Sequence, residues 1–130
     1  MLNETLMLLT IEERLIEPNI ALVELKGKLA IGRESQRVEA LTETMVLDGR
    51  TRAIFDMSGV DYTDSAGIGM LVLAAGKLKG AGGRLVVVAA PGGRVHHMLA
   101  LTQINSIVQV CGTVVEAIAA FGETFPPAAA

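Results

Sequence analysis

The sequence is poor in cysteine and in aromatic residues: its 130 residues include one Cys, no Trp, one Tyr and three Phe. A single cysteine, Cys111, excludes an internal disulfide and a zinc site built from several cysteines. Hydrophobic residues nevertheless make up 51% of the chain. The core must therefore be aliphatic, built from Leu, Val, Ile, Ala and Met.

Basic residues and long hydrophobic runs are also scarce. Eleven Lys and Arg against fourteen Asp and Glu give a formal net charge of -3, which argues against the basic patch of a nucleic-acid-binding protein. The apolar runs 70–75 and 85–91 are far shorter than the roughly 20 residues of a membrane span. The first nine residues lack the features of a secretion signal. We therefore expect a cytoplasmic protein that binds neither nucleic acid nor membrane.

The periodicity of the hydrophobic residues predicts alternating strands and helices. Strands are expected at 6–16, 20–27, 51–57, 84–90 and 106–111, and helices at 35–49, 65–79, 94–103 and 113–121. The strand-helix-strand unit from 51 to 90 predicts parallel strands. The fold class is therefore α/β: one domain over 1–125, with helices packed on a mainly parallel sheet of four to five strands. The tail 126–130 is expected to be disordered.

Signals at the ends of three predicted helices support these assignments. Gly49 stands where a left-handed C-terminal cap would end helix 35–49. Lys77 and Lys79 lie in the last turn of helix 65–79, where cations interact well with the helix dipole. Thr113 and Glu116 have the spacing of a capping box.

The stretch DYTDSAGIG (61–69) contains the main candidate site. Asp64 can cap the helix and leave Ser65 in its first turn, where a phosphate would add about -1.5 to -2 charges beside the positive end of the dipole. The small residues Ala66 and Gly67 would let another protein approach closely. From the residues alone, the simpler interpretation is favoured, in which Asp64 and Ser65 merely begin a helix.

Enzymatic interpretations of this stretch are weaker. A hydrolase elbow, G-x-S-x-G, would need glycine where Thr63 stands, and His96 and His97 are the only candidate bases. The two histidines are more simply explained as residues of a partly exposed helix, and they lack the spacing of a metal site. A dinucleotide fingerprint would need glycine at Val72.

Asp56, at the end of the predicted third strand, raises the alternative of a response-regulator receiver. That chemistry needs an acidic pair after the first strand and a lysine after the fifth. Glu12 and Glu13 would be followed by a second strand instead of a helix, and 106–113 contains no lysine. The receiver is therefore excluded, and we expect no catalytic residue, no metal and no cofactor.

The run 55–88 strongly resembles the STAS domain of bacterial anti-sigma factor antagonists. The family pattern is a strand ending in Asp-x-Ser, a short loop, and Asp-Ser-x-Gly-Leu/Ile-Gly at the start of a helix. Here the two parts are 56–58 and 64–69, and the likeness extends from about Thr10 to Phe121. The resemblance implies a single STAS-like domain.

The resemblance also implies a non-enzymatic, partner-switching phosphoprotein that regulates bacterial transcription. In the family, the unmodified domain binds a GHKL-type serine kinase that doubles as an anti-sigma factor. Phosphorylation of the motif serine releases the kinase, and a PP2C-type phosphatase resets the switch. Carried over, Ser65 is the phosphoacceptor. The partner-binding residues are Asp64, Ser65, Ala66, Gly67, Ile68, Gly69 and Ser58. A homodimer is also possible from the sequence, because an apolar face could pack in the core or against a second copy of the chain.

One departure from the family concerns the segment after the second strand. Many members have Gly-x-Leu/Ile-Asp there, and the acid contributes to kinase docking or phosphorylation. This chain has Ala30 in that place, after Gly27, Lys28 and Leu29. The alternative hypothesis is therefore a constitutive STAS scaffold subunit of a signalling or transporter-associated complex, without phosphorylation switching.

Overall fold

A computed structural model of the chain describes residues 9–16, 19–30 and 32–122, with strands and helices alternating as expected. The elements are β1 (Thr10–Ile16), β2 (Ile20–Leu29), α2 (Arg33–Leu47), β3 (Arg52–Thr63), α3 (Ser65–Gly80), β4 (Arg84–Val88), α4 (Arg94–Leu101), the 3-10 helix η1 (Ile104–Ser106), β5 (Gln109–Cys111) and α5 (Val114–Ala120). The tail 126–130 and residues 6–8 lie outside the described residues, so those two expectations stay untested.

The five strands form one sheet in the order β1-β2-β3-β4-β5. β1 pairs antiparallel with β2, and the other neighbouring strands pair parallel. In the crossover around α3, Arg52 pairs with Arg84 and Asp56 with Val88. The structure therefore confirms the predicted α/β fold with a mainly parallel sheet.

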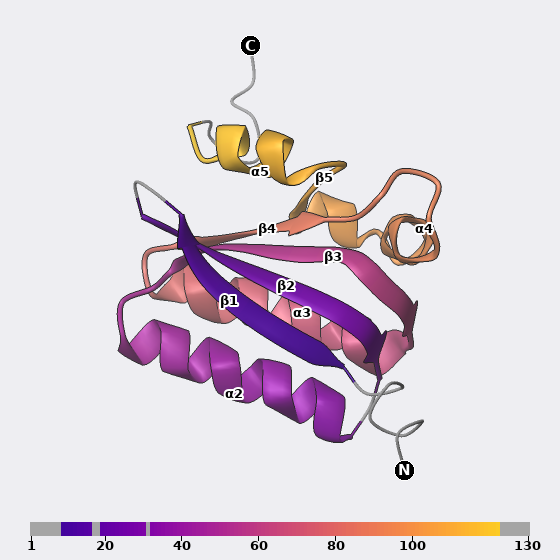
Figure 1. Ribbon diagram of the computed structural model, residues 1–130, viewed down its shortest axis with the longest axis horizontal. Helices are drawn as coiled ribbons and strands as arrows, with labels where there is room; N and C mark the ends of the chain where they lie inside the picture. The colour runs from indigo at the N-terminus through magenta and orange to yellow at the C-terminus, as the bar shows by residue number, and fades with distance from the viewer. Residues whose placement is uncertain (1–8, 17–18, 31, 123–130) are drawn as a thin grey trace.

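The helices cover the two faces of the sheet unequally. α2 and α3 lie side by side on one face, α5 lies on the other, and α4 packs against β3 (Figure 1). The larger core lies between the sheet and the α2–α3 layer and includes Val23, Phe55 and Leu71. A smaller cluster under α5 includes Ile54 and Val86. Both clusters are dominated by aliphatic side chains, as the composition predicts.

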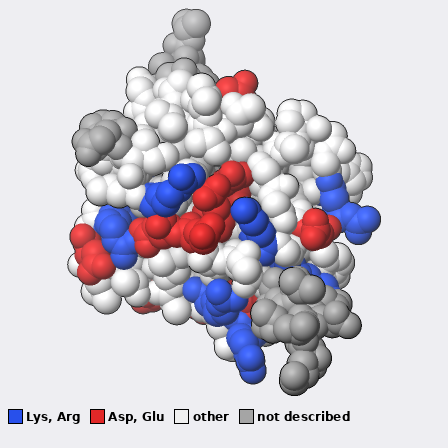
Figure 2. Space-filling view, viewed as in Figure 1, with Lys and Arg blue, Asp and Glu red and all other residues white. Residues whose placement is uncertain are grey.

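The face over β1 and β2 carries charge of both signs. Acidic side chains gather at its middle with basic ones around them (Figure 2). Arg14 on β1 and Glu24 on β2 form an ion pair there, with 3.3 Å between Nη2 and Oε1. This face therefore shows no basic patch of the kind that binds a nucleic-acid backbone.

The predicted helix ends are confirmed, with small shifts in their bounds. Gly49 has a φ of 77°, and the N–H of Arg50 donates to the carbonyl of Met45 at 2.8 Å, which closes the end of α2. α2 begins and ends two residues earlier than expected. Thr113 and Glu116 form both hydrogen bonds of a capping box at α5.

The largest errors in strand extent concern β3 and β5, whereas β2 ends two residues later and β4 two residues earlier than predicted. β3 does not end at 57 but continues to Thr63, so Asp56 lies inside the strand and no loop separates Ser58 from the site. Two register shifts explain this, because β3 twice advances one residue further than β2, between the pairs Glu24–Asp56 and Lys26–Gly59 and again after Gly27–Val60. Such bulges keep a polar segment in the sheet while breaking its alternation.

The predicted strand 106–111 is also shorter than expected. Its first residues belong to η1 or to a turn, and only Gln109–Cys111 forms β5. The Ser106 hydroxyl donates to the carbonyl of Gln103 at 2.7 Å. Such local bonds favour a turn over a strand.

Candidate functional site: a displayed serine at the start of α3

Ser65 is the first residue of α3, and its side chain is exposed. Asp64 precedes it in an extended conformation, and the Asp64 carboxylate accepts a hydrogen bond from the N–H of Gly67 at 2.9 Å. This is the predicted N-cap, and it satisfies one of the donors that the first turn of any helix leaves without an intrahelical acceptor. The Ser65 hydroxyl is therefore held on the first turn of a capped helix and faces solvent.

Gly67 fixes where this helix begins. A Cβ at this position would lie 2.3 Å from the Thr63 hydroxyl and 2.5 Å from the carbonyl oxygen of Leu29. The first turn of α3 consequently rests directly on the ends of β2 and β3. Only glycine permits so close an approach, because the Leu29 carbonyl belongs to the backbone and cannot swing away.

Gly69 lies two residues further along and has a different environment. It is exposed, and a Cβ there would meet no atom within 4 Å. Packing within the described chain therefore does not require glycine here. Its effect is to keep the surface beside Ser65 flat.

The predicted partner-binding residues of this motif divide by depth. Gly67 and Ile68 are buried, and Ile68 is only 3% exposed, so these two support the site from below. The surface itself consists of Asp64, Ser65, Ala66 and Gly69, of which Ser65 and Gly69 are exposed and the other two half-buried. We call these four residues the Ser65 surface.

Ser58 does not belong to the Ser65 surface. It precedes Thr63 by five residues of extended strand, a span on the order of 15 Å. Its N–H and hydroxyl both donate to Asp56 Oδ1, at 3.0 and 2.6 Å. The Asp-x-Ser pair therefore stabilises the first bulge of β3, which is a structural role at a distance from Ser65.

Ala30 stands where the family acid is expected, directly after Leu29, and is half-buried. Because the Leu29 carbonyl lies under Gly67, this position is close to the start of α3. The charged residue near this position is instead basic, Lys28. Lys28 pairs with Tyr62 in the sheet, and its Nζ lies 5.5 Å from the centroid of the Tyr62 ring. The sequence offered no signal for this pair, since the register depends on the bulges in β3.

Other candidate groups do not add chemistry to the Ser65 surface. His96 and His97 lie on α4, which packs against β3. Among the described residues, no three His, Cys, Asp or Glu side chains are grouped so that they could hold a metal ion. The pKa of Lys77 is raised above its usual value, chiefly by its hydrogen bond to Glu43 on α2. That contact joins the two helices near the far end of α3.

No described helix combines the length and the hydrophobicity needed to cross a bilayer.

Comparison with known proteins gives a family for most of the sequence. Residues 13–117 match the model of one protein family, described as the STAS domain. An anti-sigma factor antagonist from Mycobacterium paratuberculosis has a similar structure, with a TM-score of 0.74 and 21% identity over 88% of this chain and 95% of that one.

Two further proteins share the fold. The anti-sigma factor antagonist SpoIIAA is 19% identical in its unphosphorylated form, over 88% of this chain and all of that one, with a TM-score of 0.68. The phosphorylated form of SpoIIAA, from Bacillus, is 18% identical over 86% and 99%, with a TM-score of 0.65. A sulfate transporter family protein from Wolinella succinogenes is 16% identical over 82% and 87%, with a TM-score of 0.69. The fold is thus shared by anti-sigma factor antagonists and by a sulfate transporter family protein.

Proposed function

The chain belongs to the STAS domain family, and we propose that it acts as an anti-sigma factor antagonist whose binding is switched by phosphorylation of Ser65. The observation that carries this proposal is the exposed Ser65 hydroxyl on the first turn of α3, held there by the Asp64 cap. A kinase active site needs such access to a hydroxyl. A partner protein also needs a surface without large side chains, which Ala66 and Gly69 provide beside Ser65.

The unphosphorylated domain binds an anti-sigma factor, a serine kinase of the GHKL type, through the Ser65 surface. The kinase transfers the γ-phosphoryl group of ATP to Ser65 Oγ: the bond between the γ-phosphorus and the bridging oxygen of ADP breaks, ADP leaves, and the hydroxyl proton passes to a base of the kinase. The complex then dissociates. A PP2C-type phosphatase then hydrolyses the phosphoester and restores the binding form. The domain itself catalyses nothing. Support comes from the fold shared with SpoIIAA, a protein solved with and without its phosphate.

Incubation with the cognate kinase and ATP, followed by mass spectrometry, tests the phosphoacceptor. We expect one phosphate, on Ser65, and none in Ser65→Ala. Ser58→Ala is the matched control, because Ser58 is exposed but its hydroxyl bonds to Asp56. Phosphate elsewhere, or undiminished phosphorylation of Ser65→Ala, would overturn the assignment.

A second experiment tests the binding surface without changing charge. Gly69 and Gly76 are both exposed residues of α3, and a Cβ at either position would meet nothing within 4 Å. Both Gly→Gln variants should therefore fold, while only Gly69→Gln adds bulk beside Ser65. We expect Gly69→Gln to weaken kinase binding at least tenfold and Gly76→Gln to change it less than twofold. Equal effects would place the kinase elsewhere.

The constitutive scaffold remains a second candidate because Ala30 occupies the position of the family acid, close to the start of α3. Ala30→Asp separates the two functions. If the protein is a phosphorylation switch, Ala30→Asp restores the carboxylate that family members use for kinase docking. The substitution should then increase kinase affinity or the rate of phosphorylation several-fold. A scaffold should bind its partner equally well as wild type, Ala30→Asp and Ser65→Glu. Equal partner affinities of the three proteins, measured by calorimetry, would favour the scaffold function.

A further inference from the structure

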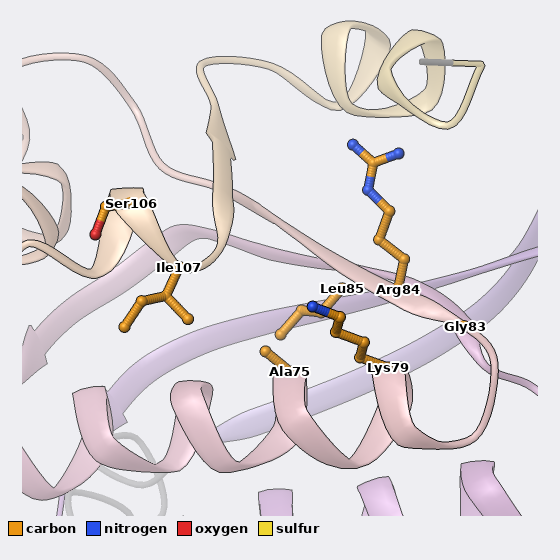
Figure 3. A pocket seen from close by; sticks show the side chains of 7 residues that line it. All are labelled: Ala75, Lys79, Gly83, Arg84, Leu85, Ser106 and Ile107. Carbon is orange, nitrogen blue, oxygen red and sulfur yellow. The ribbon is translucent and has the colours of Figure 1, made fainter. Parts of the chain in front are cut away.

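A pocket opens beside β4 because β5 is too short to cover it. β4 begins at Arg84, whereas its pairing with β5 begins only at Val86, opposite Gln109. The uncovered start of β4, the last turns of α3 and the segment after η1 enclose a pocket of about 320 Å³ (Figure 3). The pocket lies near the lower limit of volumes found for small-molecule sites.

The walls of this pocket combine apolar and polar groups. Ala75 contributes from α3, Leu85 from β4 and Ile107 from the turn before β5. Ile107 is 58% exposed, so its side chain presents apolar surface to solvent beside the pocket. The Ser106 hydroxyl already donates to Gln103 and can offer a ligand only its oxygen as an acceptor.

Lys79 supplies the charge of the pocket. Its side chain points from α3 toward Leu85, whereas the Arg84 guanidinium points away (Figure 3). Arg84 donates to the carbonyl of Ala120 at 2.9 Å and to Gln109, so it is engaged with α5 and β5. No described residue that lines the pocket is acidic.

The two lysines of this helical turn differ in their partners. Lys77 forms ion pairs with Glu39 and Glu43 on α2. In the described part of the chain, Lys79 has no carboxylate within ion-pair distance. The ammonium group of Lys79, an exposed residue, thus lies at the edge of the pocket without an ion-pair partner among the described residues.

We propose that this pocket binds a small amphipathic anion, namely a carboxylate with a short hydrocarbon chain. The carboxylate pairs with Lys79 Nζ, and the chain lies against Leu85 and Ile107, where it removes apolar surface from water. Fourteen residues of helix, or roughly 21 Å, separate Lys79 from Ser65. The site is therefore separate from the Ser65 surface, and this inference stands independently of the proposed function.

Titration of ¹⁵N-labelled protein with octanoate, followed by NMR, tests the inference. We expect amide shifts concentrated at Ala75, Lys79, Leu85 and Ile107, and saturation below about 1 mM. Octanol has the same chain without the charge and should bind at least tenfold more weakly. Lys79→Gln should reduce the difference in affinity between octanoate and octanol to less than twofold. Lys77→Gln removes the same charge from the same turn and should leave the difference unchanged.

Filling the pocket gives an independent check. Ala75→Leu adds three carbons to its wall and should abolish the octanoate shifts while the rest of the spectrum stays folded. The inference is overturned if octanoate causes no saturable shifts, if the shifts lie elsewhere, or if octanol binds as tightly. An equal loss in Lys77→Gln and Lys79→Gln would also overturn it, because net charge alone would then explain the binding.

Discussion

Replacing Gly67 by alanine should destabilise the domain, although alanine is the better helix former. Within a helix, alanine is favoured over glycine by about 1 kcal/mol. Against this, the new Cβ would lie 2.5 Å from the Leu29 carbonyl oxygen and 2.3 Å from the Thr63 hydroxyl. Leu29 pairs with Thr63 in the sheet, so neither strand end can move without disturbing the other.

The steric term should exceed the helix-propensity term. Overpacking a tight contact costs about 1–3 kcal/mol, and more where backbone is involved. After subtraction of the propensity gain, Gly67→Ala should therefore lower the free energy of unfolding by about 1–2 kcal/mol, which corresponds to roughly 3–8 °C in Tm for a domain of this size. Gly69→Ala is the control, because its Cβ meets nothing within 4 Å. It should raise stability by about 0.5–1 kcal/mol.

Urea unfolding followed by circular dichroism measures both variants against the wild type. The expected result is opposite signs for two identical substitutions two residues apart in one helix. If both variants stabilise the domain, the contact between α3 and the end of β2 is looser than 2.5 Å implies. If both destabilise it, Gly69 is packed in a way that its open surroundings do not explain.

Two further predictions concern contacts away from the site. Phe121→Leu should lower the free energy of unfolding, measured in urea, by about 1–2 kcal/mol. The guanidinium groups of Arg52 and Arg84 lie 5.1 and 5.4 Å from the ring centroid, and the substitution removes both cation–π contacts. A decrease below about 0.5 kcal/mol would show that the ring contributes only by its bulk. Lys77→Gln should lower stability by an amount that depends on pH. Glu43 raises the pKa of Lys77 above the usual 10.5, so the stabilisation is present in full below that pH and is lost as the pH rises through the folded-state pKa. The difference from wild type in urea unfolding should stay constant between about pH 8 and 10 and shrink above; a difference that persists above this range would contradict the ion-pair explanation.

The features predictable from the sequence were those decided by local chemistry. The Asp64 cap, the Gly49 turn and the Thr113 capping box each depend on residues within one turn of helix, and all three are confirmed. The burial of Ile68 also had a signal, because this residue falls on the apolar face of its helix. Its place among the partner-binding residues came from the family motif and stays a prediction.

The features that escaped prediction depend on contacts between distant segments. β3 remains in the sheet to Thr63 only because two bulges adjust its register to β2, and bulges leave no period-two pattern in the sequence. Likewise, the need for glycine at Gly67 comes from a carbonyl 38 positions earlier, at Leu29. The family pattern includes both Leu29 and Gly67. The spacing of these two residues along the sequence does not show that they are in contact.

The electrostatics of Ser65 indicate how a phosphate would act there. A phosphate carries about -1.5 to -2 charges, and the positive end of a helix dipole stabilises a negative charge by about 0.3–1 kcal/mol. The neighbouring Asp64 carboxylate, at roughly 6 Å in a water-like dielectric, opposes it by about 0.7 kcal/mol per charge. These terms nearly cancel, so phosphorylation should change the stability of the domain by less than about 1 kcal/mol.

A modification that leaves the fold unchanged can alter binding only at the contact itself. Any partner that covers Ser65 would have to strip water from a doubly charged group, which costs several kcal/mol unless the partner supplies cations. Release on phosphorylation therefore requires a partner whose surface opposite Ser65 lacks Lys and Arg. We expect Ser65→Glu to keep its circular dichroism spectrum and to lose binding to the proposed kinase. If Ser65→Glu keeps both, phosphate at Ser65 is not what separates the two proteins.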